Sequence, residues 1–202
     1  MQTKRVSVTS LARRRQIVEG AIDVLADGKH GTSFARIAER AGLSSPGLIS
    51  YHFTDRRDLL AALLEYVDER RNAIIEAALA PGGSAAERLA SLLTSDMEYL
   101  TAHPKVFAAV VEAFHELRDD EGRLAHLGRR SGAYDALVGL LREGQRSGEF
   151  ADTYDAESLA LLFDGARTQF LAQIHRRPDL DVDAFTRTLV GLALTAVEES
   201  RA

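Results

Sequence analysis

The chain has 202 residues, of which 46% are apolar, and a net charge of −5. This length fits one large domain, or a small domain fused to a larger one. The sequence contains no cysteine, which excludes disulfides, thiolate metal ligands and a cysteine nucleophile.

The sequence offers no segment that suits a membrane. The longest uncharged run near the C-terminus, residues 188–197, has ten residues, whereas a helix that spans a bilayer needs about 20. Lys4 and Arg5 are not followed by an apolar run, so no signal peptide is expected. We therefore expect a cytoplasmic protein with no membrane partner.

The charge is distributed unevenly along the chain. Residues 1–57 carry ten Lys and Arg against five Asp and Glu, whereas residues 58–202 carry fifteen against twenty-five. The basic N-terminal segment and the acidic remainder are typical of a nucleic-acid-binding head on a regulatory body.

The N-terminal part is predicted to begin with two helices. Residues 1–10 are polar and are expected to form a flexible arm, and apolar spacing predicts a helix over residues 11–27. Thr32 or Ser33 can cap a second helix. Gly42 ends this helix, since glycine suits a left-handed position after a helix.

A short third helix and a long fourth one follow. Ser44 or Ser45 is expected to cap the third helix, with Pro46 in its first turn. The fourth, amphipathic helix should run to about residue 79. Asp55 and Asp58 have the spacing of an N-cap and its N3 partner at its start.

The rest of the chain also has helical patterns. The Pro-Gly-Gly-Ser sequence at residues 81–84 is a clear break. Beyond it we expect helices over residues 85–102, 105–117, 121–147 (with Gly132 as a candidate break), 155–176 and 183–200. No run of alternating apolar and polar residues competes, so the predicted fold class is all-α. We expect a three-helix N-terminal domain over residues 1–57 and a C-terminal helical bundle over residues 58–202.

The second and third predicted helices, joined by a tight glycine turn, have the outline of a helix-turn-helix. In this motif the second of the two helices enters the DNA major groove. Small polar residues on that helix let its N-terminal amides approach a phosphate. Arginines at the start of the following helix could clamp another phosphate. The candidate DNA-binding residues are Arg13, Ser44, Ser45, Pro46, Gly47, Ser50, Tyr51, His52, Arg56 and Arg57.

For several of these residues, a purely structural role is the alternative to DNA binding. Capping and solvent exposure account equally well for the serines, and simple packing is the alternative for Tyr51 and His52.

Residues 11–65 resemble the N-terminal domain of the TetR family of bacterial transcriptional regulators. Five short segments carry the resemblance: Gly20–Leu25, Gly31-Thr32-Ser33, Ile37-Ala38 with Ala41-Gly42, Tyr51-His52-Phe53 and Asp58-Leu59-Leu60. The sequence departs from the family pattern in two places. Arg56 or Arg57 stands where the family usually has a lysine, and the stretch between Gly42 and Phe53 is one residue longer than the commonest spacing.

The resemblance implies a homodimeric repressor that binds a palindromic DNA operator and is released by a small-molecule inducer. It implies no cofactor. The C-terminal domain would both dimerise and bind the inducer. The last two predicted helices have unusually wide apolar faces, which fits a four-helix interface between two copies, although deep burial inside one subunit is the alternative. The candidate interface residues are Leu159, Phe163, Phe170, Phe185, Leu189, Leu192 and Ala196.

An apolar cavity with a few polar groups is the default ligand site in such a domain. The candidate lining residues are Met97, Tyr99, Phe107, Phe114, His115, Tyr134, Phe163 and Arg167. Nothing in the sequence specifies the chemistry of the ligand.

The alternative hypothesis is a helical small-molecule-binding protein or enzyme whose first three helices are only structural. Glu112 and His115 form one Glu-x-x-His pair, but a di-iron bundle needs a second pair. The six histidines are scattered, and no phosphate loop or nucleophile elbow is present. The acidic residues 119–121 suit a solvated helix start. We therefore expect no catalytic residues, no metal and no enzymatic activity.

Overall fold

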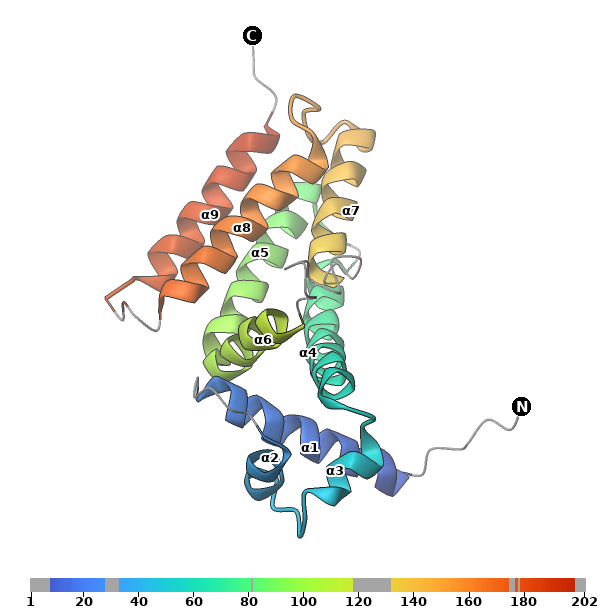
Figure 1. The fold of residues 1–202 in the computed structure, drawn as a ribbon. Helices are drawn as coiled ribbons and strands as arrows, with labels where there is room; N and C mark the ends of the chain where they lie inside the picture. Colours follow the sequence, from blue (N-terminus) through green and yellow to red (C-terminus); the bar gives the residue numbers. More distant parts are fainter. Residues whose placement is uncertain are drawn as a thin grey trace, which may run out of the picture. The chain divides into compact units, whose positions relative to one another are not determined.

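The computed structural model of the protein describes residues 8–27, 33–80, 82–117, 132–174, 177 and 179–198. These residues form nine α-helices and no strand (Figure 1), which confirms the predicted all-α class. The helices are α1 (Val8–Ala26), α2 (Phe34–Arg40), α3 (Gly47–His52), α4 (Arg56–Ala78), α5 (Ala85–Ala102), α6 (Pro104–Glu116), α7 (Gly132–Ser147), α8 (Ala156–Ile174) and α9 (Val182–Val197).

The chain divides into two compact units. Unit 1 comprises residues 1–68 and 104–128, and unit 2 comprises residues 69–103 and 129–202. The long helix α4 therefore contributes its first half to unit 1 and its second half to unit 2. The functional division expected between residues 57 and 58 stays a prediction.

Unit 1 is built around α1, which packs against α2, α3 and α6. One face of α1 is apolar because Ile17, Val18 and Ala21 recur at helical spacing. These side chains are buried together with Ile49 of α3 and Phe53, which follows it. Leu11, nearer the start of α1, is exposed.

Two glycines shape this region: Gly42 forms the turn between α2 and α3, and Gly20 lies where α1 meets the end of α2. Gly42 adopts a φ of 65°, the left-handed conformation predicted for it. Gly20, in the middle of α1, lies against the end of α2, and a Cβ added there would come within 2.8 Å of the Cβ of Ala41. Glycine at position 20 thus allows α1 and α2 to approach closely.

The helix caps agree only in part with the predictions. Ser33 caps α2 as expected, with its hydroxyl accepting a hydrogen bond from the Arg36 amide. The prediction that Ser44 or Ser45 caps α3 is wrong. Pro46 is the N-cap residue of α3 and supplies no side-chain hydrogen bond. A proline ring already holds φ near the helical value, so α3 begins without a polar cap.

The first residues of α1 and α4 can be compared with two further predictions. Helix α1 begins at Val8, inside the segment predicted to be a flexible arm. At α4, Asp55 accepts a hydrogen bond from the Asp58 amide at 2.9 Å, as its N-cap spacing predicts. The Asp58 carboxylate accepts in return from the amide of Thr54 at 2.8 Å.

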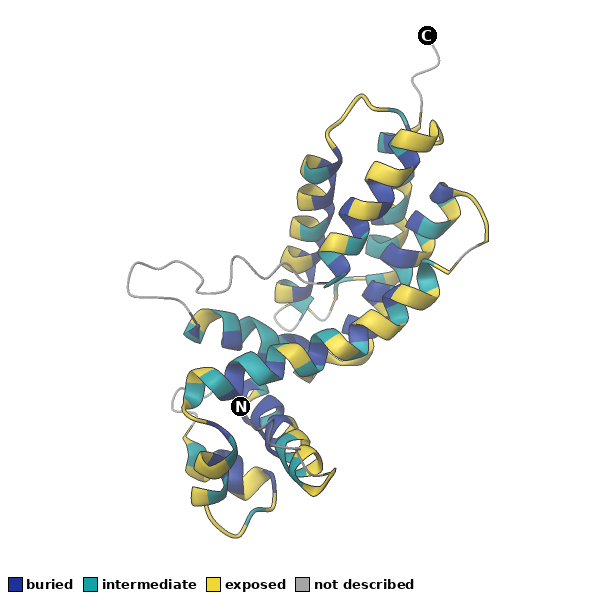
Figure 2. Ribbon diagram, turned by 90° about the vertical axis from the view of Figure 1, so that its right-hand side faces the viewer, coloured by how far each residue is buried: buried dark blue, intermediate teal, exposed yellow. Residues whose placement is uncertain are grey.

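Unit 2 packs α5 against α7 and α9, and α8 against α7 and α9 (Figure 1). Helix α5 begins with a complete capping box between Ser84 and Glu87. Buried and exposed stripes alternate along these helices (Figure 2), as expected for amphipathic helices around one core. Only the part of the predicted 121–147 helix from Gly132 onward lies within the described residues.

Candidate DNA-binding and ligand sites

Helix α3 presents a polar outer face above a fully buried anchor. Ile49 of α3 and the following Phe53 have almost no exposed surface, and together they hold the helix on the core. The predicted DNA-binding residues on and before α3 are exposed, and Tyr51 keeps 80% of its surface open to solvent. The exposed residues are Ser44, Ser45, Pro46, Gly47, Ser50 and Tyr51.

His52, at the end of α3, is half-buried beside Tyr51. The two rings meet edge to face, with centroids 5.1 Å apart. Burial lowers the pKa of His52, and the nearby positive charges of Arg14 and Arg13 lower it further. The imidazole is therefore neutral near pH 7 and can donate only one hydrogen bond.

The basic cluster at the start of α1 is engaged within unit 1. Arg13 donates to the Gln16 side chain at 2.8 Å. Arg14 donates to the backbone carbonyl of His52 and lies 4.2 Å from the centre of the Phe53 ring, a cation–π contact. Arg14 thus braces the end of α3 against α1. The sequence showed its charge but not this partner, which is 38 residues away.

The two arginines that open α4 have different surroundings. The Arg56 guanidinium makes two hydrogen bonds with the Glu116 carboxylate at the end of α6. Arg57 is exposed and forms no ion pair with another residue of the described segments. Arg57 is therefore the more accessible of the two for a DNA phosphate.

The predicted ligand-site residues belong to different units. Phe107, Phe114 and His115 lie on α6 in unit 1. Of these three, Phe107 is buried and His115 is exposed. The other predicted residues lie in unit 2, where Met97 and Tyr99 are buried on α5. Whether any of them binds a ligand stays a prediction.

A buried network of charges lies at the centre of unit 2. The Asp96 carboxylate of α5 accepts hydrogen bonds from Arg71 of α4 and from Arg167 of α8. Arg167 also donates to Asp164, one turn earlier on α8. Burial alone lowers the pKa of the Arg167 guanidinium, but the two carboxylates outweigh it and raise the pKa overall. The Arg167 guanidinium therefore stays charged in spite of its burial.

Arg167 was predicted from the sequence as a ligand-site residue, but Arg71 and Asp96 were missed. A signal for Asp96 was available, because this carboxylate falls on the apolar stripe of α5. It lies three or four residues from neighbours on the same buried face, which comprises Leu89, Leu92, Leu93 and Leu100. A charged residue on such a stripe requires a buried partner.

A small cavity of about 20 Å³ adjoins this network. This volume holds about one water molecule. The cavity combines an apolar wall with polar groups of the network, and it brings together three of the predicted ligand-site residues, Tyr134, Phe163 and Arg167. The remaining lining residues are Leu92, Leu93, Asp96, Ala133, Leu137 and Asp164.

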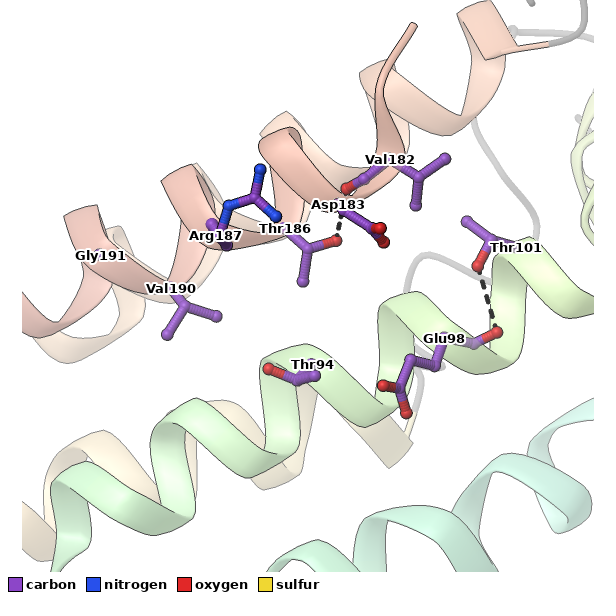
Figure 3. A pocket seen from close by; sticks show the side chains of 9 residues that line it. All are labelled: Thr94, Glu98, Thr101, Val182, Asp183, Thr186, Arg187, Val190 and Gly191. Atoms are coloured by element: carbon purple, nitrogen blue, oxygen red, sulfur yellow. Dashed lines mark hydrogen bonds between the residues drawn. The ribbon is translucent and has the colours of Figure 1, made fainter.

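A larger groove of about 450 Å³ lies between α5 and α9 (Figure 3). Its lining contains none of the predicted site residues. The hydroxyls of Thr101 and Thr186 are engaged by backbone carbonyls of their own helices. Its lining residues are Thr94, Glu98, Thr101, Val182, Asp183, Thr186, Arg187, Val190 and Gly191.

The wide apolar faces of α8 and α9 are divided between the inside and the outside of unit 2. Four of the expected interface residues, Leu159, Phe163, Phe170 and Leu189, are buried within the unit. Half-buried Phe185 stacks on Phe170 with ring centroids 3.9 Å apart, and Ala196 is also half-buried. The four buried side chains contribute to the unit's own core, and whether any of the seven residues also contacts a partner stays a prediction.

The exposed apolar residues of these helices are different ones. Leu161 and Leu162 of α8 are 65% and 67% exposed, and Leu192 of α9 is 62% exposed. Leu192 alone among them was predicted as an interface residue. In a helix that is apolar on two sides, spacing alone does not indicate which side lies inside.

The surroundings of the Glu-x-x-His pair of α6 offer no metal site among the described residues. Glu112 is half-buried and His115 is exposed. Within the described segments, no three His, Asp or Glu side chains are placed to share a metal ion. The acidic residues 119–121 and three of the six histidines lie outside the described residues. No described helix is long and apolar enough to cross a bilayer.

Comparisons with known proteins match both parts of the chain. Residues 17–63 match the model of bacterial regulatory proteins of the tetR family, and residues 82–171 match a tetracyclin repressor-like C-terminal domain. The transcriptional regulator BetI of Klebsiella pneumoniae is 35% identical over 89 residues, which are 43% of this chain and 45% of BetI. BetI of Escherichia coli K12 is 34% identical over the same length. The alignment thus spans less than half of these relatives.

Solved structures with low sequence identity share the fold. The regulator FadR from Bacillus subtilis, in complex with stearoyl-CoA, is 21% identical, with a TM-score of 0.72 over 91% of this chain and 99% of FadR. FadR from Bacillus halodurans is 24% identical, with a TM-score of 0.77 over 90% and 94% of the two chains. A transcriptional regulator from Saccharomonospora viridis, in complex with choline, is 23% identical, with a TM-score of 0.77 over 94% and 99%.

Proposed function

We propose, from the premise that this chain belongs to the TetR family of bacterial regulatory proteins, that it binds operator DNA and that a small molecule controls this binding. The family is one of regulators rather than enzymes. The observation that carries the proposal is the exposed polar face of α3 above the fully buried Ile49 and Phe53. The exposed Tyr51 hydroxyl on this firmly anchored helix is free of burial and available to donate to a phosphate.

The proposed DNA contacts follow from exposure. Helix α3 enters the major groove, with Ser45, Gly47 and Ser50 near the bases and Tyr51 at the backbone. Arg57 neutralises a phosphate from the start of α4. Arg13 and His52 are both half-buried, and Arg13 donates to Gln16 of its own helix, so this proposal places neither of them at the bases. DNA binding by these residues should weaken steeply as salt rises.

Two copies of the chain would read the two halves of a palindromic site. Their recognition helices would lie one DNA turn apart, about 34–36 Å, or a multiple of that. We propose that the exposed leucines Leu161, Leu162 and Leu192 form the contact between α8 and α9 of two copies. Burying these side chains would stabilise the dimer by the hydrophobic effect. Such a regulator would act in the cytoplasm, where bacterial DNA lies.

The proposed inducer site is the cavity beside Arg167, Tyr134 and Phe163 in unit 2. The cavity must open to admit anything larger than water, so ligand binding would change the packing around Asp96. Asp96 is bonded to Arg71 of α4, and α4 continues to Arg57. A ligand that prefers one arrangement of this network would thereby alter the affinity for DNA.

The experiment begins with selection of a duplex from a random-sequence library by the full-length protein. A palindromic consensus that outcompetes random duplex at moderate salt is expected. The charge reversal Arg57→Glu should weaken binding to that duplex, whereas Arg187→Glu on α9 should not. No preference over random duplex would refute the proposed function.

Dimerisation and induction are tested separately. Leu162→Glu should shift the protein to a monomer in sedimentation analysis, while Leu11→Glu, which changes an exposed leucine of unit 1, should leave the dimer intact. A dimer that survives Leu162→Glu and Leu192→Glu together would contradict the proposed interface. Choline and stearoyl-CoA, bound in two of the similar structures, are the first probes for release of the DNA complex.

A further inference from the structure

Arg56, the first residue of α4, is held by Glu116, the last residue of α6. Its Nε donates to Glu116 Oε2 and its Nη2 donates to Oε1. The two side chains are 35% and 26% exposed, so water reaches the pair only in part. Paired hydrogen bonds between a guanidinium and a carboxylate are stronger than ordinary ones, and partial burial reduces their screening by salt.

The position of Arg56 suits a second partner. It begins α4 only three residues after Phe53, the C-cap residue of α3. Its neighbour Arg57 is exposed, so the start of α4 is a place from which arginines can reach outward. The two N–H groups that Arg56 donates to Glu116 are the same groups with which a guanidinium binds two phosphate oxygens. Arg56 therefore cannot hold Glu116 and a phosphate in this way at the same time.

We propose that Glu116 competes with a DNA phosphate for Arg56, so that α6 controls how many phosphates the head of the protein binds. This inference rests on the proposed DNA-binding function and concerns its regulation. In the arrangement that the structure describes, Glu116 binds Arg56, and of the two arginines at the start of α4 only Arg57 is available. When the end of α6 moves away from α4, Arg56 turns to the DNA and binding tightens.

The attachment of α6 to α1 is consistent with this role. Near its start, Lys105 of α6 forms an ion pair with Asp23 of α1 at 2.9 Å. This pair is more exposed than the Arg56–Glu116 pair and so contributes less to holding α6. Of these two ion pairs, the firmer one is thus the pair that removes an arginine from the DNA-binding side. A small molecule that favours the paired arrangement weakens DNA binding without touching α3.

The test compares the wild-type protein with Glu116→Gln on the duplex that the wild type selects. Loss of the carboxylate frees Arg56, and we expect binding to tighten about three- to tenfold, which is the net contribution of one ordinary hydrogen bond. The plot of log affinity against log salt should steepen by about one, because one more phosphate is neutralised. The double variant Arg56→Gln with Glu116→Gln should lose this gain.

Two controls separate competition from other effects. Glu112→Gln removes the same charge from α6 one turn earlier and should leave affinity and salt slope unchanged. Glu116→Asp keeps the charge but shortens the reach to Arg56, and it should give a smaller gain. Thermal unfolding followed by circular dichroism verifies that each variant is folded. If Glu116→Gln does not fold, the affinity and salt slope of Glu116→Asp test the proposal instead.

The outcomes are distinct. If the wild type binds its selected duplex but neither Glu116 variant binds more tightly, the competition is refuted while the proposed function stands. An equal gain from Glu112→Gln would likewise refute it, because the effect would then be one of net charge. If the wild type selects no duplex, the proposed function fails and the competition fails with it.

Discussion

The Asp96 carboxylate of α5 accepts three hydrogen bonds from the Arg71 guanidinium of α4. Arg71 Nε and Nη2 lie 3.0 and 2.7 Å from Asp96 Oδ1, and Nη2 lies 2.9 Å from Oδ2. Both side chains are about one-tenth exposed. Because Arg167 shares the same carboxylate, removal of Asp96 would leave two buried positive charges without their common partner.

We therefore expect Asp96→Ala to destabilise the protein by about 3–5 kcal/mol, as is typical when one member of a buried ion pair is removed. The free energy of unfolding in urea measures this loss. Asp164→Ala is the matched control, because Asp164 is more exposed and contacts only Arg167 in the network. The decrease in the free energy of unfolding caused by Asp164→Ala should be clearly smaller. Equal losses from the two variants would show that Asp96 does not hold the network together.

Gly20 should be intolerant of even one added methyl group. In Gly20→Ala the new Cβ meets the Cβ of Ala41 at 2.8 Å and the Ala41 backbone at 3.2 Å. Overpacking of this kind costs about 1–3 kcal/mol, which outweighs the usual gain from alanine in a helix. Gly139→Ala in α7 faces open space and should stabilise the protein. Thermal unfolding of both variants tests the prediction, and stabilisation by Gly20→Ala would contradict it.

Tyr51→Phe should weaken DNA binding about three- to tenfold without altering stability, since it removes one exposed hydroxyl that donates to a phosphate. Tyr154→Phe changes another exposed tyrosine, in unit 2, and should leave binding unchanged. Binding titrations on the selected duplex measure both. Unaltered affinity of Tyr51→Phe would contradict the proposed contact between the hydroxyl and a phosphate.

His52 should make stability depend on pH in a defined direction. Burial and the neighbouring arginines lower its pKa from the ordinary value of 6.5. The unfolded chain therefore takes up a proton before the folded protein does, and stability falls as the pH drops below about 6.5. Above that pH the contribution is fully present.

The measurement compares urea unfolding of the wild type and His52→Gln at pH 7.5 and pH 5.5. The wild type should lose more stability between the two values than the variant, because the variant lacks this titration. Identical losses would mean that the folded protein protonates His52 as readily as the unfolded chain does.

The sequence by itself determined the helices, the α2–α3 turn and the helix-turn-helix. Local physics suffices for these features: apolar residues repeat with the helical period, and Gly42 adopts the left-handed conformation that other residues avoid. The N-cap at Ser33 follows from the same short-range hydrogen bonding. The cap of α3 was misjudged because Pro46 starts that helix without a polar side chain.

Only the tertiary structure decided which charged and apolar groups have partners. Arg56 and Arg57 are equivalent in sequence, but Glu116, 60 residues away, engages the first and not the second. Likewise, α8 and α9 are apolar on more than one side, and packing within unit 2 selected Phe163 and Leu189 for the core while leaving Leu162 exposed. Such choices depend on contacts between distant segments, and helical periodicity contains no information about them.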